Sequence, residues 1–276
     1  MKIRELFNVS GTEIVFLTII YLLGLYFRLA PRLAIDAHLL TFQGDIWYRL
    51  CMAQYIFDNA ALPEPDIRYE AYGYVPMWYP PVSPVFFALL SYLSGLDIPT
   101  VSSRILPFIE SFAPLSLYFL ARHIYNKKVA FIATTTLALT PSFVFWSGIS
   151  DPQSFTLFMI PIFILLWIWH SKQPSNLRLL GIGILLGMNF ITHLSYFVEI
   201  LVLLMVTIAL IVKKEAKRRL LADLGKVVLI SQAITFPWWF LSKLDMPAQF
   251  SLLQKNLYCW WINALVTSSG MYKPGQ

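Results

Sequence analysis

Charged side chains are scarce in this sequence. Asp, Glu, Lys and Arg make up 13% of the 276 residues, while hydrophobic residues make up 58%. An ordinary soluble domain carries about a quarter charged residues. The shortage of charge therefore excludes an ordinary soluble domain and predicts a chain that lies in a lipid bilayer.

Cysteine is rare as well, and a secretion signal is lacking. Cys51 and Cys259 form neither a CxxC pair nor a metal-ligand spacing, so we expect both thiols to be free. The first apolar run, from Ile14 to Phe27, leads into basic residues and proline rather than into a small-residue cleavage site. We interpret this run as a first membrane helix.

The net charge of +6 does not indicate a nucleic-acid partner. In a membrane chain an excess of Lys and Arg usually lies in the cytoplasmic loops. We therefore expect membrane lipid and no nucleic acid around this chain, and we use the basic residues to predict its topology.

Eight apolar stretches are candidates for membrane segments. They lie at about 14–30, 82–96, 105–121, 129–146, 152–169, 179–193, 195–212 and 227–241. Basic residues gather in four clusters between them, which the positive-inside rule places on the cytoplasmic side: Lys2/Arg4, Arg122/Lys127/Lys128, Lys172/Arg178, and Lys213/Lys214/Lys217/Arg218/Arg219.

The number of segments between clusters predicts which segments cross. Two segments separate the second cluster from the third, and two more separate the third from the fourth, so each pair leaves and returns. Three segments separate the first cluster from the second, which is an odd number. We predict that 82–96, which follows Tyr79-Pro80-Pro81, does not cross fully. The alternative, in which all three cross and one cluster lies on the outer side, stays open.

This topology gathers ionisable residues on the external face. Such residues at membrane depth are costly and mark functional sites. The loop at about 31–81 is then external, and the external set comprises Asp45, Asp97, Arg104, Asp151 and His193, with Glu110 and Glu199 in the outer parts of their helices.

The external loop contains a predicted amphipathic helix that begins with an acid. Apolar residues follow Gly44-Asp45 at helical spacing, namely Ile46, Leu50, Ala53, Ile56 and Phe57. Asp45 is therefore either a functional carboxylate at the water–lipid boundary or simply a helix cap.

Aromatic and basic residues follow in the same loop. Tyr and Trp favour the headgroup level and also stack on sugars; here they are Tyr69, Tyr72, Tyr74, Trp78 and Tyr79. Arg49 and Arg68 are suited to a phosphate, because a guanidinium binds oxyanions through two hydrogen bonds. The alternative for these arginines is a salt bridge to Glu64, Asp66 or Glu70.

A second acid stands at a predicted helix start on the same face. Asp151 precedes Pro152, which is typical of a first helical turn, so a capping role is again the alternative. Asp45 and Asp151 together supply oxygen ligands for one divalent cation, Mg²⁺ or Mn²⁺. Such a cation would neutralise a departing phosphate.

The order of these features resembles the GT-C glycosyltransferases, and most closely the catalytic subunit of oligosaccharyltransferase and its single-chain archaeal and bacterial relatives. The matching pieces are Gly44 to Arg49, Trp78 to Pro81, the basic hinge Tyr118 to Lys128, and Pro141 to Asp151, within about residues 10–215. The resemblance implies a polyprenyl-phosphate or pyrophosphate sugar donor and a protein or lipid acceptor. It implies Asp45 as base or metal ligand and Asp151 as metal ligand.

Two features depart from that family. Its second acidic motif has the form Asp-x-Asp or a close variant, whereas this chain has Gln153 in the third place. Its Trp-Trp-Asp motif is missing, and Trp260-Trp261-Ile262 has isoleucine where the acid belongs. The first departure favours the alternative of a transferase that needs no metal.

Two further residues complete the predicted site. His193 lies at a predicted external turn, where it binds the lipid phosphate or relays a proton, or else has a structural role. Glu199 and Glu110 are candidates to pair with Arg104 or His193 across the bundle.

Taken together, the sequence predicts an all-α polytopic membrane bundle of GT-C type with an amphipathic helix in its first external loop. Residues 1–241 form the membrane domain, and 242–276 form an external tail or the start of a further loop. The predicted enzyme moves a sugar or oligosaccharide to an acceptor, such as a protein asparagine, on the outer face of a prokaryotic plasma membrane rather than in the endoplasmic reticulum. The predicted catalytic residues are Asp45 and Asp151. The predicted substrate-binding residues are Arg49, Arg68, Tyr79, His193 and Glu199. The alternatives are a metal-independent transferase to a hydroxyl or lipid, and a non-catalytic subunit or transporter.

Overall fold

The computed structural model describes residues 9–34, 44–63, 80–148, 153–193, 196–212 and 217–242. All regular secondary structure in these ranges is helical, which confirms the predicted all-α class. The chain divides into two compact units, residues 1–62 with 80–236 and residues 63–79 with 237–276. The described part of the second unit is little more than the end of one helix, and the other described helices belong to the first unit.

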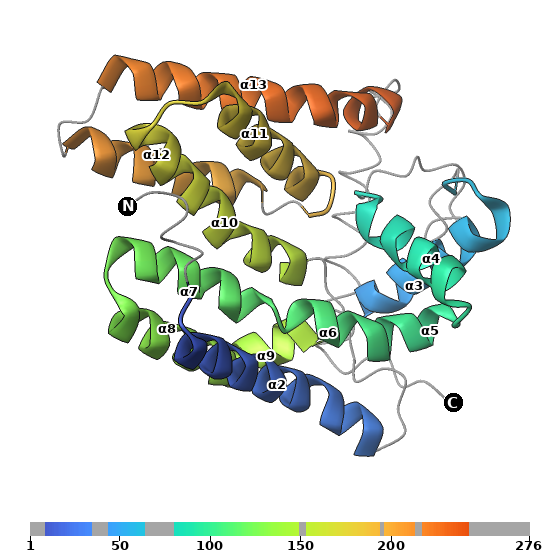
Figure 1. The fold of residues 1–276 in the computed structure, drawn as a ribbon. Coiled ribbons are helices and arrows are strands. Elements are labelled where there is room, and N and C mark those ends of the chain that lie inside the picture. The colour runs from blue at the N-terminus through green and yellow to red at the C-terminus, as the bar shows by residue number, and fades with distance from the viewer. Residues whose placement is uncertain are drawn as a thin grey trace, which may run out of the picture. The chain divides into compact units, whose positions relative to one another are not determined.

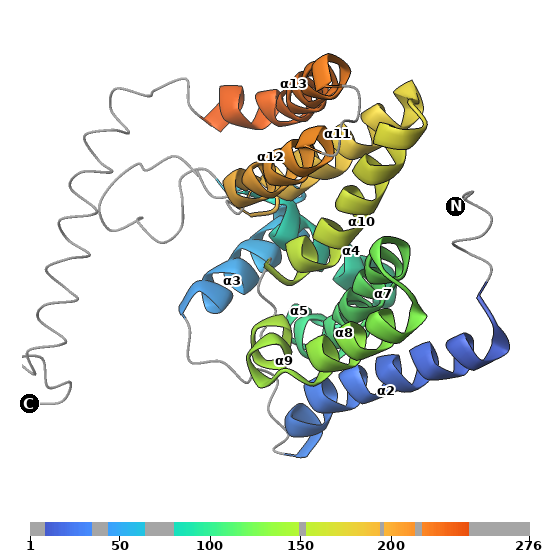
Figure 2. The same ribbon diagram turned by 90° about the vertical axis from the view of Figure 1, so that its left-hand side faces the viewer.

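Within the described residues, three unbent helical stretches are long and apolar enough to cross a membrane. They are α2 (Gly11–Ala34), the run Ile98–Ile124, and Arg219–Pro237 within α13 (Lys217–Ser242). Shorter apolar stretches are α4 (Val82–Ser94), the part Thr156–Lys172 of α10 (Gln153–Lys172), α11 (Asn176–Phe190) and α12 (Tyr196–Val212). Figure 1 shows α2 beside α8 (Lys127–Leu139), and Figure 2 shows α13 lying over α11 and α12.

Helix α2 is longer than the apolar run that predicts it. It continues through Pro31 to Ala34, into the stretch predicted as loop. Arg28 and Arg32 are therefore helical and, being four residues apart, lie on one face. Both side chains are buried against neighbouring helices.

The run Ile98–Ile124 is a single path with irregular turns. It comprises α5 (Ile98–Thr100), the π-helical turn η2 (Val101–Ile105), α6 (Leu106–Glu110) and α7 (Ala113–Ile124). Pro107 and Pro114 lie within it, and neither has an N–H to donate to a carbonyl of the preceding turn. The path therefore exposes backbone acceptors that other side chains can use.

The predicted segment 129–146 is instead two helices. Helix α8 (Lys127–Leu139) and α9 (Pro141–Gly148) meet at an angle of 63°. The residue before a proline is disfavoured in the helical region, and Thr140 is extended, with φ −67° and ψ 116°. Pro141 thus turns the chain and carries α9 toward α2 and α6, both of which it contacts.

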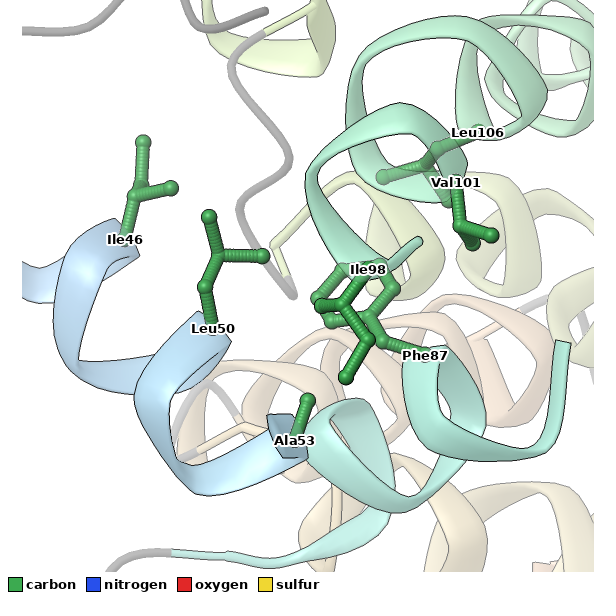
Figure 3. Close-up of a cluster of buried hydrophobic side chains, with 7 residues drawn as sticks. All are labelled: Ile46, Leu50, Ala53, Phe87, Ile98, Val101 and Leu106. Atoms are coloured by element: carbon green, nitrogen blue, oxygen red, sulfur yellow. The ribbon is translucent and has the colours of Figure 1, made fainter. Parts of the chain in front are cut away.

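The amphipathic helix expected in the first loop forms as predicted. Helix α3 (Gly44–Asn59) buries Ile46, Leu50 and Ala53 against Phe87 of α4 and against the start of the α5 path (Figure 3). Phe57, which the spacing places on the apolar face, is 43% exposed in the last turns of the helix. This packing fixes α3, and with it Asp45 in its first turn, to the beginning of the α5 path.

Helix α4 is too short to cross by itself. Its 13 residues span about 20 Å, against about 30 Å for the hydrocarbon core of a bilayer. It ends at Gly95, whose φ of 68° suits glycine, and Asp97 then caps α5 by accepting from the Thr100 N–H at 2.6 Å. The length agrees with a segment that does not cross, which stays a prediction.

The segments carrying the predicted cytoplasmic clusters meet at one end of the bundle. Glu13, near the start of α2, contacts Arg122 at 3.3 Å and Lys127 at 2.8 Å. At the end of α10, Lys172 Nζ lies 3.4 Å from His123 Nε2, and Arg219 donates to the Ser171 carbonyl at 2.5 Å. The shared location agrees with the predicted topology.

Cysteine labelling checks this topology. In a chain with Cys51→Ser and Cys259→Ser, we expect Leu96→Cys to react with a membrane-impermeant maleimide on intact cells. We expect Tyr125→Cys to react only after permeabilisation. Both native side chains are exposed, at 40% and 69%. If α4 crosses, the two sites exchange sides, so the reverse pattern would overturn the prediction.

Helices α11 and α13 approach closely through two glycines. A Cβ on Gly183 would lie 2.5 Å from Ile230 Cγ2, and one on Gly187 would lie 3.0 Å from Ile234 Cβ. Gly181, on the same helix, has open space around it. Close approach of this kind is a common packing device in membrane helices.

We expect Gly183→Ala to lower the free energy of unfolding by about 1–3 kcal/mol, because the added methyl overlaps Ile230. Gly181→Ala is the matched control, and we expect it to be neutral or stabilising by up to about 1 kcal/mol. Thermal unfolding of the two variants in detergent is the measurement. Equal shifts for both would contradict the close packing.

Candidate functional site

Two arginines of α2 are buried where the last turns of that helix meet η2, α6 and α9. Arg28 is 2% exposed and Arg32 is 3% exposed. Burying a guanidinium is costly unless hydrogen bonds and opposite charge compensate it. The partners of these two side chains therefore indicate what the site is built to do.

Arg28 is held by hydrogen bonds to α9 and to its own helix. Its Nε and Nη2 donate to Ser147 Oγ at 3.0 and 2.5 Å, and its Nη1 donates to the Gly24 carbonyl at 2.8 Å. The guanidinium also lies over the Phe143 ring, 5.5 Å from its centroid. Arg28 thus fixes the end of α9, three residues before Asp151.

Arg32 uses a carbonyl that a proline leaves available. Pro107 has no N–H to donate to the Ser103 carbonyl four residues earlier, and Arg32 Nη1 donates to that oxygen at 2.7 Å. Arg32 Nε has no hydrogen-bond partner within the described ranges. A buried donor without a partner costs about 1–3 kcal/mol, so this atom is suited to an additional acceptor.

Glu110 supplies the negative charge of this cluster. Its side chain is 2% exposed, so it is not at the interface with water, and its charge interacts with those of Arg28 and Arg32. We call these three side chains the arginine–glutamate cluster. Its members carry two positive charges and one negative charge.

The predicted carboxylates are only partly described. Asp45 lies in the first turn of α3, as expected, but its side chain is not among the described ones. Asp151, Arg68 and Tyr79 lie outside the described residues. The approach of Asp45 and Asp151 therefore stays a prediction. The described residues contain no group of three His, Cys, Asp or Glu able to hold a metal.

Arg49 is buried on α3, with 3% exposure, and is not a surface group. It lies on the same helix as Ile46, Leu50 and Ala53, which form the core with α4. Its assignment as a substrate-binding residue stays a prediction.

His193 and Glu199 are joined through Asn189. The backbone N–H of His193 donates to the backbone carbonyl of Asn189 at 2.8 Å. The side-chain Nδ2 of Asn189 donates to Glu199 Oε2 at 3.0 Å. Glu199 is fully buried. The neighbouring Ile191 carbonyl accepts from the Val82 N–H at 3.3 Å, so this turn lies at the start of α4, just after the aromatic–proline stretch.

Arg28 and Arg32 were not among the predicted site residues. The sequence signal was available, because two arginines four residues apart continue an apolar helix, and an arginine at membrane depth is a functional candidate. The proline between them favoured a loop, which concealed their common helical face.

Residues 79–240 match the family described as dolichyl-phosphate-mannose-protein mannosyltransferase. That is more than half of the chain. The chain belongs to this family. As a member of the mannosyltransferase family it is an integral membrane glycosyltransferase of GT-C type that uses a polyprenyl-phosphate-linked sugar donor. The closer likeness to oligosaccharyltransferase is not confirmed.

The match begins at Tyr79 and runs through α4 to α13, so α2 and α3 precede it. A search of curated proteins finds no match to the chain. The arginines of the cluster therefore lie outside the matched region, while Glu110 and Ser147 lie within it.

Proposed function

We propose that this chain transfers a single sugar from a polyprenyl monophosphate to a hydroxyl group of a protein, at the external face of the membrane and without a metal. The family match carries the proposal, because the family's description names a monosaccharide on a lipid phosphate and a protein acceptor. Gln153, in place of a second acidic ligand, supports the metal-independent form.

Asp45 is the proposed general base. It would accept the proton of the acceptor hydroxyl while that oxygen bonds to the anomeric carbon and the bond from the carbon to the phosphate oxygen breaks. The electron pair of the broken bond stays on the lipid phosphate. The first turn of an amphipathic helix packed on the α5 path is a rigid position for such a base.

The developing negative charge on the phosphate is the second requirement. A preorganised positive environment stabilises it best where water is excluded. In the metal-dependent alternative, Asp45 and Asp151 would share a cation for this purpose. The two mechanisms differ in their response to a chelator.

A transfer assay tests the proposal. Membranes carrying the chain are supplied with radiolabelled dolichyl-phosphate mannose and with peptides whose acceptors are Ser and Thr hydroxyls, or with a peptide offering an Asn-x-Ser sequence with its hydroxyl blocked. We expect label in the hydroxyl peptides, undiminished by EDTA. Membranes without the chain are the control. Label in the asparagine peptide alone, or loss of transfer with EDTA, would contradict the proposal.

A further inference from the structure

We propose that Arg28 and Arg32 bind the phosphate group of the lipid carrier. The inference concerns where the donor is held and rests on the proposed function only for the donor being a lipid monophosphate. It assigns a binding role to two residues of α2 that lie outside the region matched to the family.

The charge of the cluster is the first argument. Two buried guanidiniums face one buried carboxylate, which leaves one positive charge uncompensated among these three side chains. An uncompensated charge is strongly disfavoured in a water-poor interior. A phosphodiester carries one negative charge, so a sugar-phosphate lipid would neutralise the cluster. The phosphate left after transfer carries up to two and would be held more strongly.

Hydrogen bonding is the second argument. Ser147 Oγ of α9 orients the Arg28 guanidinium, and the Ser103 carbonyl of η2 orients the Arg32 guanidinium. Arg32 Nε remains without a partner among the described residues, although the side chain is 97% buried. A phosphate oxygen is the acceptor that a guanidinium binds most strongly, often through two parallel bonds.

The surroundings of the pair suit an amphipathic ligand. Phe27 and Leu33, beside the arginines in sequence, are exposed on the outer surface of α2. An apolar exposed face next to a buried cationic site lets a polyprenyl tail remain in the bilayer while its phosphate enters the protein. A water-soluble anion has no apolar tail and would gain nothing from this exposed face.

A binding experiment tests the assignment. The purified full chain is immobilised in detergent and titrated with radiolabelled dolichyl phosphate. Dolichol, inorganic phosphate and phosphatidylglycerol serve as competitors. We expect saturable binding that dolichol and phosphatidylglycerol displace poorly and that inorganic phosphate displaces only at much higher concentration.

Substitutions locate the site. Arg32→Gln is expected to weaken dolichyl phosphate binding about tenfold to a hundredfold, as for loss of a charged hydrogen bond. Arg32→Lys keeps the charge but loses the planar fork, and we expect an intermediate loss. The matched control is Arg178→Gln at the other end of the bundle, where the guanidinium donates to the Trp169 and Gln173 carbonyls. We expect it to bind like the native chain.

Several outcomes would overturn the inference. One is unchanged binding in Arg32→Gln or, if that variant fails to fold, in Arg32→Lys, which would mean that another part of the chain neutralises the cluster. Others are displacement by dolichol as good as by the phosphate lipid, or binding of inorganic phosphate alone. The proposed function fails separately, because dolichyl phosphate binding that depends on Arg32 in a chain without transfer to hydroxyls would retain this inference and reject that reaction.

Discussion

Asp45→Asn is expected to abolish sugar transfer while the chain remains folded. A positioned general base contributes about 10²–10⁴-fold to a rate, and an amide cannot accept the proton. Asparagine is nearly as good as aspartate at a helix start, so α3 should keep its first turn. The core of Ile46, Leu50 and Ala53, which holds α3 in place, is untouched by the change.

The matched control for this experiment is Asp97→Asn. Asp97 is also an aspartate at a helix start on the predicted external face, and it caps α5 by accepting from the Thr100 N–H. Asparagine retains that hydrogen bond, so we expect transfer to remain within about twofold of the native rate. The measurement is label transfer from dolichyl-phosphate mannose at equal amounts of folded chain. Equal effects of the two substitutions would reduce Asp45 to a helix cap.

Glu13→Ala is expected to destabilise the chain by about 3–5 kcal/mol, the range found when one partner of a buried ion pair is removed. Glu13 is 1% exposed and accepts from Tyr118 Oη at 2.5 Å and from Ser10 Oγ at 2.7 Å. It also pairs with Arg122, which is buried. Removing the carboxylate would take a buried partner from both that guanidinium and the phenol hydroxyl.

Lys127→Ala is the control within the same network. Lys127 contacts Glu13 at 2.8 Å, but its side chain is 52% exposed. Exposed ion pairs contribute about 0–1 kcal/mol, so we expect a small loss. Denaturant or thermal unfolding in detergent measures both variants. If Glu13→Ala were as mild as Lys127→Ala, the network would not be what joins α2 to the α7–α8 turn.

Some features of the fold could be predicted from the sequence and others could not. Long apolar segments such as the first helix were predictable, because lipid exposure requires apolar helices. The turn between α7 and α8 was predictable from its cluster of basic residues. Pro141 indicates a break at Thr140. Hydrophobicity by itself nevertheless predicts one continuous segment where the structure has α8 and α9. The opposite holds at Pro31, between Arg28 and Arg32, because a proline favours a helix end whereas α2 continues past it.

The amino-acid sequence by itself determined that this protein is an all-helical membrane chain, where most of its helices lie, and that an acid stands in the first turn of α3. These properties follow from local composition and from spacing along one helix. Only the tertiary structure decided that Arg28, Arg32 and Glu110 form one cluster. The two arginines lie on α2, whereas Glu110 lies on α6. Their meeting depends on a carbonyl that Pro107 leaves available and on a bend that brings Ser147 to Arg28. Contacts between distant segments depend on how whole helices pack, which no local pattern specifies.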